Sequence, residues 1–247
     1  MENRTYDSFA DKYDFLMRDI SYEEWSDYLC SFLDESDKEI KKICDIGCGT
    51  GSITVLLSER GYSLTGIDQS VGMLEIASEK ARSSGQRIMF SNQDLKELVL
   101  GRTDVVVMNM DVINYIAPED LQMSFERISG GLKKGGLMLF DISSGYKIRN
   151  ILGNNFFYED YDDVTYFWKN TLSDDEKSVD MELTFFIRDG EGYKRRDEFQ
   201  TQYAHEADDV KKTLEKAGFS VDIYAFGTRD KVKEDTERIF FRCRKDK

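Results

Sequence analysis

Short apolar runs alternate with longer amphipathic segments between residues 43 and 140. A short apolar run suits a strand buried on both faces, whereas apolar residues three or four apart suit a helix packed on a sheet. The predicted strands are 43–46, 64–67, 88–91, 105–108 and 137–140, and the predicted helices are 50–60, 70–82 and 118–128. Gly135-Gly136 is expected to form a tight turn before the last strand. This order predicts a doubly wound, mostly parallel sheet.

Helical patterns flank this alternation at both ends. Residues 5–17 carry apolar side chains at helical spacing, and Ser21 with Glu24 forms a capping box that begins a second helix over 21–33. The C-terminal elements expected are a helix over 208–217 and strands over 219–226 and 238–242. The whole pattern predicts an α/β, Rossmann-like fold with a seven-stranded, mostly parallel sheet and a helical cap at the N-terminus.

The pattern changes after about residue 153. Five apolar residues stand at alternate positions, namely Val179, Met181, Leu183, Phe185 and Ile187, and the residues between them are polar apart from Phe186. This period of two is typical of a half-buried strand, and Asp189-Gly190 marks a turn after it. We therefore expect residues 154–204 to form a small antiparallel sheet, inserted into a domain made of residues 1–153 and 205–247.

A glycine-rich run follows the first predicted strand. Asp45 is followed by Gly47, Gly49 and Gly51, and Asp68 ends the second predicted strand. Glycine lets the backbone approach a ligand closely, and an acid after the second strand can accept hydrogen bonds from a ribose. A tight strand-to-helix turn without a ligand is the alternative for the glycines alone. Together with the acid, they predict a nucleoside-binding site.

The spacing of the glycines selects among nucleoside sites. A dinucleotide fingerprint requires G-x-G-x-x-G, and here its third position is Ser52. The observed pattern, an acid, one residue and then G-x-G-x-G, resembles the first motif of class I S-adenosylmethionine-dependent methyltransferases. The resemblance covers roughly residues 40–145 strongly. Residues 6–17 add a weaker resemblance to small-molecule N- and O-methyltransferases, such as sugar and glycine or sarcosine N-methyltransferases.

This resemblance implies a set of residues that bind S-adenosylmethionine. They follow successive strands of the predicted sheet, apart from one tyrosine in the N-terminal helix that covers the cofactor. The set is Tyr13, Asp45, Gly47, Cys48, Gly49, Gly51, Asp68, Gln69, Met73, Asp94, Leu95 and Met110. The resemblance also implies that the last two strands form an antiparallel hairpin at the edge of the sheet. For Asp94, a helix N-cap is the alternative role.

Three residues are candidates for catalysis. Asp111 and Tyr115 follow the fourth strand, where the resembled family faces the methyl acceptor, and His205 is the only histidine in the chain. The pKa of histidine suits general-base chemistry at neutral pH. Structural roles are the alternative: a packed aromatic ring for Tyr115 and a loop or cap residue for His205. A sulfonium already activates its methyl group, so neither a metal nor a covalent intermediate is expected.

The charge and cysteine content of the chain limit which partners and ligands are expected. The chain of 247 residues has a net charge of −14, which disfavours a nucleic-acid partner. The four cysteines have no spacing typical of zinc sites or disulfides, and neither a signal peptide nor a membrane span is expected. We expect a cytoplasmic monomer or homodimer without a bound metal.

The leading hypothesis is an enzyme that transfers a methyl group in line to a nitrogen or oxygen of a small molecule, with residues 154–204 as a lid or acceptor-binding element. Alternatives are a methyltransferase acting on tRNA or protein, and a protein that binds S-adenosylmethionine without catalysis. A nicotinamide oxidoreductase is disfavoured by Ser52.

Overall fold

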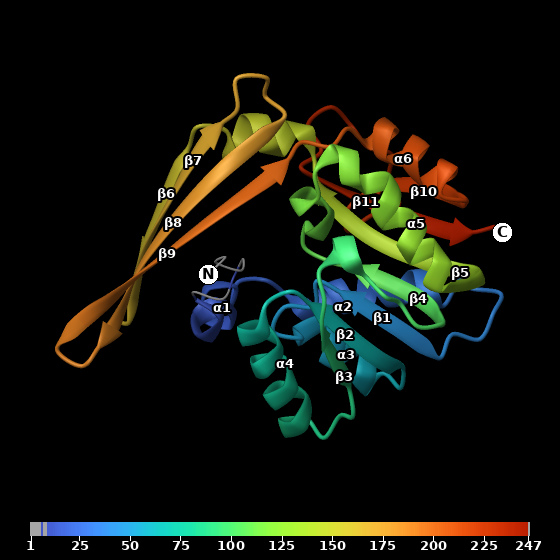
Figure 1. Cartoon of the computed structure of the whole chain (residues 1–247), viewed down its shortest axis with the longest axis horizontal. Coiled ribbons are helices and arrows are strands. Elements are labelled where there is room, and N and C mark those ends of the chain that lie inside the picture. Colours follow the sequence, from blue (N-terminus) through green and yellow to red (C-terminus); the bar gives the residue numbers. More distant parts are fainter. Residues whose placement is uncertain (1–5, 7–8, 247) are drawn as a thin grey trace.

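The computed structural model describes Tyr6 and residues 9–246, and it contains two separate β-sheets (Figure 1). The α-helices are α1 (Ala10–Leu16), α2 (Tyr22–Leu33), α3 (Ser52–Glu59), α4 (Val71–Ser83), α5 (Leu121–Gly131) and α6 (Ala207–Lys216). The strands of the larger sheet are β1 (Lys42–Ile46), β2 (Ser63–Asp68), β3 (Met89–Asn92), β4 (Thr103–Met108), β5 (Leu132–Ser143), β10 (Phe219–Ala225) and β11 (Arg238–Lys245). Those of the smaller sheet are β6 (Phe156–Asp160), β7 (Val164–Leu172), β8 (Ser178–Asp189) and β9 (Gly192–Tyr203). Single turns are the 3₁₀ segments η1 (Leu95–Glu97), η2 (Val112–Tyr115) and η3 (Pro118–Asp120) and the π-helical η4 (Lys147–Leu152).

The larger sheet has the strand order β10-β11-β5-β4-β1-β2-β3. Strands β1 to β5 pair in parallel, and β11 runs antiparallel to both of its neighbours, β5 and β10. This confirms the predicted α/β fold with a seven-stranded, mostly parallel sheet. It also confirms the expected antiparallel hairpin, with β10 at the edge and β11 inside it.

Helices cover both faces of this sheet. On one face, α2 and α3 pack against inward-facing residues of β1, β4 and β5, with Phe32 and Leu57 fully buried. On the other face, α5 and α6 cover the alternate residues of the same strands, with Phe125 and Leu214 fully buried. A parallel sheet buried on both faces explains why its strands are continuous apolar runs in the sequence.

Local signals set the predicted helix boundaries. The Ser21 hydroxyl accepts a hydrogen bond from the amide of Glu24, and the Ser70 hydroxyl accepts one from the amide of Met73. Each satisfies an amide that the first turn of a helix leaves unpaired. Gly61 follows α3 with φ +95°, a conformation that favours glycine.

Two predicted boundaries were wrong. The expected turn at Gly135-Gly136 lies inside β5, which begins at Leu132 and runs to Ser143. The strand passes this point through a shift in register against β4, where Gly135 adopts φ +74°. The expected helix over 5–17 is α1, which begins only at Ala10; residues 1–5, 7 and 8 lie outside the described part, and Tyr6 lies in a turn.

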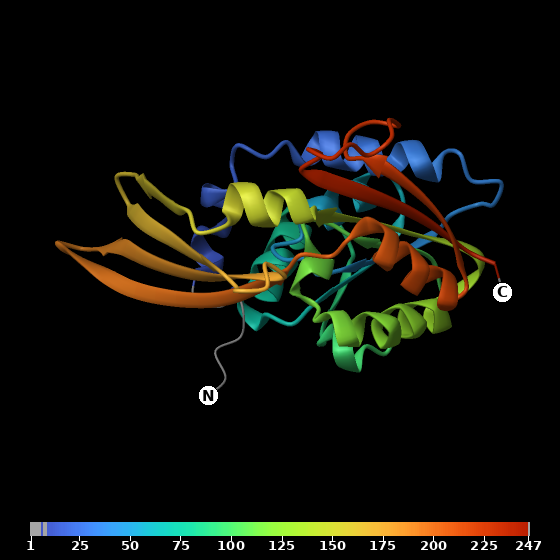
Figure 2. The same cartoon turned by 90° about the horizontal axis from the view of Figure 1, so that it is seen from above.

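The smaller sheet is antiparallel throughout, with strand order β6-β7-β8-β9. It extends from one end of the larger sheet (Figures 1 and 2). One of its faces packs on α1, where the rings of Phe9 and Phe185 stack with centroids 4.4 Å apart. Further along, Val179 and Met181 pack against Ile148 and Leu152 of η4. The sheet confirms the predicted insertion, while its exact boundaries at residues 154 and 204 stay a prediction.

Among the described residues, no helix is both long and apolar enough to cross a membrane.

Replacing Phe241 tests the seam between β5 and β11. Its ring is fully buried and stacks on Phe140 with centroids 4.7 Å apart. Phe241→Ala should lower the free energy of unfolding by about 3–5 kcal/mol through the cavity it leaves, measured by urea denaturation. Phe156→Ala is the matched control because Phe156 is 57% exposed. Equal losses for both variants would contradict this account of the core.

Candidate functional site

A cavity of about 380 Å³ opens at the carboxyl ends of β1, β2 and β4 and extends to β9 of the smaller sheet. This is where open α/β sheets bind ligands. The lining residues from the larger sheet and its loops include Asp45, Gly47, Cys48, Gly49, Asp68, Gln69, Met73, Gln93, Asp94, Leu95, Asn109, Met110 and Tyr115. The N-terminal segment and β9 add Tyr6, Tyr13, Tyr22, Phe199, Gln200, Thr201 and Tyr203.

Three glycines shape the loop after β1, and each has a positive φ between +53° and +75°. A Cβ at Gly47 would lie 2.4 Å from the Val112 side chain, and one at Gly51 would lie 2.9 Å from the Ala77 side chain. A Cβ at Gly49 would meet no atom within 4 Å. Gly47 and Gly51 are therefore required by packing, while Gly49 presents bare backbone to the cavity.

Asp68 fixes this loop from the end of β2. One of its carboxylate oxygens accepts a hydrogen bond from the amide of Gly49 (2.8 Å), and the other accepts one from the amide of Ser70 (2.9 Å). The amides of Gly47 and Cys48 donate to the carbonyl of Ile67 (2.7 and 3.0 Å). The glycine loop and the end of β2 are thereby held as one unit.

Asp94 both lines the cavity and caps η1. Its carboxylate accepts a hydrogen bond from the amide of Lys96 (2.8 Å), and the adjacent Leu95 is buried. The N-cap that the sequence analysis gave as the alternative role of Asp94 is therefore present. Because the capping residue also lines the cavity, capping and ligand binding are compatible.

Asp45 lies buried beneath the glycine loop. The hydroxyl of Thr54 donates to its carboxylate (2.6 Å), yet burial raises the pKa of Asp45 to about 7. The nearby amide of Asn109 favours the charged form of Asp45. Neither polar atom of that buried amide has a hydrogen-bond partner of normal geometry among the described residues. A ligand with polar groups could satisfy both side chains, because buried polar groups are costly when unpaired.

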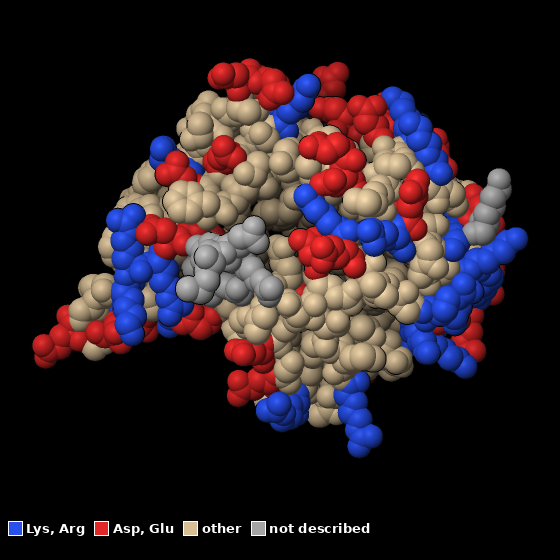
Figure 3. Space-filling model, in the orientation of Figure 1, with Lys and Arg blue, Asp and Glu red and all other residues tan. Residues whose placement is uncertain are grey.

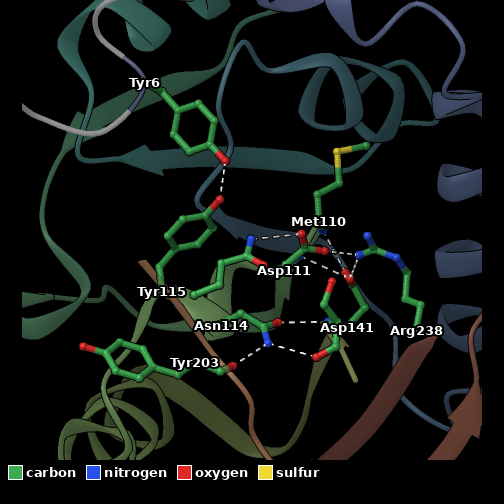
Figure 4. Close-up of polar contacts among 10 residues, drawn as sticks. Tyr6, Met110, Asp111, Asn114, Tyr115, Asp141, Tyr203 and Arg238 are labelled. Atoms are coloured by element: carbon green, nitrogen blue, oxygen red, sulfur yellow. Dashed lines mark hydrogen bonds and ion pairs between the residues drawn. The ribbon is translucent and has the colours of Figure 1, made fainter. Parts of the chain in front are cut away.

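A buried ion network lies beside the loop after β4 (Figure 4). Asp141 is fully buried, and its carboxylate accepts hydrogen bonds from the amides of Met110 (2.8 Å) and Asp111 (3.2 Å). Arg238 forms ion pairs with the carboxylates of both Asp111 and Asp141. Met110 and Asp111 have φ near +62°, which is costly for residues with a Cβ. Burial opposes the charge of Asp111, but Arg238 prevails and lowers its pKa, whereas burial raises the pKa of Asp141 to about 6.

Three tyrosines lie close together in the cavity lining. The hydroxyl oxygens of Tyr6 and Tyr115 lie 2.6 Å apart, and the Tyr115 hydroxyl donates to Gln200 (3.1 Å). The ring of Tyr13 lies edge-on to that of Tyr6, with centroids 5.7 Å apart. Burial raises the pKa of all three hydroxyls, so they stay protonated at neutral pH.

His205 does not line the cavity. The residue is 5% exposed, and Nε2 lies 3.2 and 3.0 Å from the carbonyl oxygens of Ile113 and Ile116. Because carbonyls only accept, Nε2 carries the proton and donates to them. Burial lowers the pKa of this histidine. Its position therefore stabilises η2 rather than facing a ligand.

The structure brings most of the predicted site residues together. Eleven of the twelve cofactor candidates line the cavity, together with the catalytic candidate Tyr115. The exceptions are Gly51, which packs α3 against α4, Asp111, whose carboxylate pairs with Arg238, and His205. The sequence analysis missed Tyr6, Tyr22, Asn109 and Gln200 as lining residues. Of these four, only Tyr6 belongs to a segment that the sequence analysis singled out, residues 6–17 with their weaker resemblance to small-molecule methyltransferases.

Comparisons with known proteins identify the family. Residues 43–136 match the family described as a methyltransferase domain. A protein of Geobacillus sp. (strain WCH70), whose name places it among methyltransferases, is 37% identical over 246 residues, covering 98% of this chain and 100% of the relative. A crystal structure of an S-adenosylmethionine-dependent methyltransferase from Clostridium acetobutylicum ATCC 824 has 35% identity and a TM-score of 0.89, covering 98% of this chain and 99% of that one.

The chain belongs to the class I S-adenosylmethionine-dependent methyltransferases. The sugar N-methyltransferase KedS8 from Streptoalloteichus sp. ATCC 53650 has the same fold, with 17% identity, a TM-score of 0.79 and coverage of 99% and 96% of the two chains. The cofactor of this methyltransferase is S-adenosylmethionine. The cavity suits it, because Gly49 leaves room for a closely bound ligand and Asn109 offers unpaired polar atoms. Among the described residues, no cluster of His, Cys, Asp or Glu could hold a metal ion.

Asp45 makes the stability of this methyltransferase depend on pH. Its pKa is raised to about 7 in the fold, so folding favours the protonated acid. The stability that this group contributes is full below its usual pKa and is lost as pH rises to about 7. The melting temperature of the wild type should therefore fall relative to that of Asp45→Asn between about pH 4 and pH 7. A difference that stays constant with pH would contradict this, and exposed Asp163→Asn controls for the loss of one negative charge.

Proposed function

We propose that this methyltransferase acts on a small molecule and transfers the methyl group in line to a nitrogen or oxygen atom. Bound S-adenosylmethionine supplies a methyl group that its sulfonium has already activated. The work left to the protein is then to orient the nucleophile and to exclude water. In this proposal the glycine loop and Asp68 hold the methionyl and ribose part, while Asp94 and Leu95 hold the adenine.

The observation that carries this proposal is that the smaller sheet supplies part of the cavity lining. Gln200, Thr201 and Tyr203 from β9 line the cavity together with Tyr6 from the N-terminal segment. In this proposal the nucleophile reaches the cofactor beside these residues and the loop after β4. A cavity of about 380 Å³ suits a small acceptor better than a macromolecule, and residues of β9 in its lining give the smaller sheet the role of an acceptor-binding lid.

The catalytic candidates fit this proposal unequally. Tyr115 lines the cavity beside Tyr6 and can contact the acceptor directly. Asp111 and His205 are not among the residues that line the cavity, so we propose that they position η2 and the loop after β4 rather than contact the acceptor. In the same ion network, Asp141 accepts the hydrogen bond from the amide of Met110 and keeps that residue at the cavity wall.

The alternatives find less support. The most basic stretch of the insertion, residues 194–196, pairs each of its charges with an aspartate: Lys194 with Asp189, Arg195 with Asp197 and Arg196 with Asp11. Acidic and basic side chains are interspersed on the face shown in Figure 3. RNA binding relies on unpaired positive charge facing the phosphates. The name of KedS8 agrees with a small acceptor, although at 17% identity its likeness shows only the fold.

The size of the acceptor can be tested directly. A cell extract is separated by dialysis into small molecules and macromolecules, and each fraction is incubated with the enzyme and methyl-labelled S-adenosylmethionine. We expect enzyme-dependent label in the small-molecule fraction. Label in RNA or protein instead would contradict the proposal, and cofactor binding without any transfer would favour a non-catalytic protein.

Asp68→Ala tests the proposed ribose site. The variant loses a carboxylate that can accept hydrogen bonds from the ribose and also holds the amide of Gly49. Since hydrogen bonds to a charged group are worth roughly 1.5–3 kcal/mol each, the affinity for S-adenosylhomocysteine should fall at least 10-fold in calorimetric titration. NAD serves as the control ligand and exposed Asp163→Ala as the control variant. Unchanged affinity in Asp68→Ala would refute the assignment.

A further inference from the structure

A polar cluster in the cavity points to the chemistry of the methyl acceptor. Gln200 is 8% exposed, and its amide nitrogen has no hydrogen-bond partner among the described residues. Its amide oxygen accepts a hydrogen bond from the hydroxyl of Tyr115 (3.1 Å), which in turn contacts the hydroxyl of Tyr6 (2.6 Å). A buried donor without a partner is costly, so its presence in a cavity wall indicates a ligand that pairs with it.

The cluster lies away from the residues assigned to the nucleoside. Asp68 and Asp94 follow β2 and β3, at one side of the larger sheet. Tyr115 belongs to η2 after β4, and Gln200 belongs to β9 of the smaller sheet. Tyr6 and Tyr115 point toward one another in Figure 4, and both line the cavity. This is the acceptor side of the proposed site.

The direction of each hydrogen bond follows from the chemistry of the three groups. Because an amide oxygen only accepts, the single proton of the Tyr115 hydroxyl is donated to Gln200. Tyr6 must then donate its own proton to the oxygen of Tyr115. The lone pairs of the Tyr6 oxygen therefore remain to accept, while the amide nitrogen of Gln200 remains to donate.

Contacts with the smaller sheet keep Tyr6 in place. Its amide donates to the carboxylate of Glu198 (2.5 Å), which lies two residues before Gln200 on β9. Its backbone has φ +72°, a conformation that is costly for a tyrosine and so needs such contacts. The same strand thereby fixes both free groups, the accepting oxygen and the donating nitrogen.

We propose that Tyr6, Tyr115 and Gln200 form the acceptor subsite, and that it selects a small molecule in which an N–H or O–H group neighbours an oxygen atom. The ligand's N–H or O–H donates to the oxygen of Tyr6, and its oxygen accepts from the amide nitrogen of Gln200. An amino alcohol is the simplest ligand of this class. This inference rests on the proposed function, because it assumes that this side of the cavity receives the acceptor.

The test uses two probes that differ by one oxygen. Trans-2-aminocyclohexanol and cyclohexylamine are titrated at pH 7, where both amines are fully protonated and carry the same charge, into the protein saturated with S-adenosylhomocysteine. A neutral hydrogen bond changes affinity by roughly 3- to 10-fold, so the amino alcohol should bind tighter by that factor. Equal affinity, or no measurable binding of either probe, would overturn the proposal.

Two variants separate the roles of the subsite groups. Gln200→Met should remove the advantage of the amino alcohol while leaving cyclohexylamine unaffected. Tyr6→Phe should weaken both probes to a similar degree, because both carry the N–H group. Matched controls are Tyr158→Phe, at a residue 65% exposed on β6, and Gln122→Met, whose amide nitrogen bonds only Glu126 on the surface of α5.

The affinity for S-adenosylhomocysteine decides between this subsite and a cofactor role. It should stay within 2-fold of the wild type in both variants, which also shows that they fold. A larger loss would assign these hydroxyls to the cofactor and overturn the proposal. Wild-type behaviour of the probes in both variants would also overturn it. The dialysed-extract experiment tests the proposed function independently of these titrations. If label is transferred to small molecules but the two probes bind equally well, the acceptor subsite is refuted while the proposed function stands.

Discussion

At the carboxyl end of β5, the Asp141 carboxylate accepts hydrogen bonds from two successive amides, those of Met110 and Asp111, and it pairs with Arg238. Both amides belong to residues with a positive φ, so the loop after β4 is held in a costly conformation. An acid at full burial is itself costly unless it is paired. The hydrogen bonds and the ion pair compensate for both costs, and the result is a fixed loop at the cavity wall.

The reversed strand β11 acquires a functional meaning from this network. Its first residue, Arg238, lies opposite Ser143, just beyond the carboxyl end of the parallel strands. A parallel strand in that position would begin at the amino ends of the other strands. The antiparallel direction of β11 therefore helps to bring the guanidinium of Arg238 to the site. The antiparallel hairpin thus supplies the cation that the two aspartates need.

Sequence patterns predicted the parts of the site that are local in the chain. The glycine loop, Asp68 and Asp94 each follow a strand by a fixed spacing, and their physical reasons are short-range. The polar cluster and the ion network could not be predicted in this way, since Tyr6 and Tyr115 are 109 residues apart and Asp111 and Arg238 are 127 apart. For the same reason the register shift in β5 was missed: Gly135-Gly136 has the composition of a turn, and only pairing with β4 continues the strand through it.

The N-terminal segment connects the two halves of the site. On one side, Asp14 accepts a hydrogen bond from Thr50 of the glycine loop (2.6 Å) and pairs with Lys80 (2.8 Å). On the other side, Asp11 pairs with Arg196 of β9 (2.7 Å), close to the anchor of Tyr6 on the same strand. A displacement of the glycine loop therefore reaches the wall of the proposed acceptor subsite through a single helix. If that helix is the link, replacing Asp14 should weaken the binding of both the cofactor and the amine probes, although Asp14 is not itself among the residues that line the cavity.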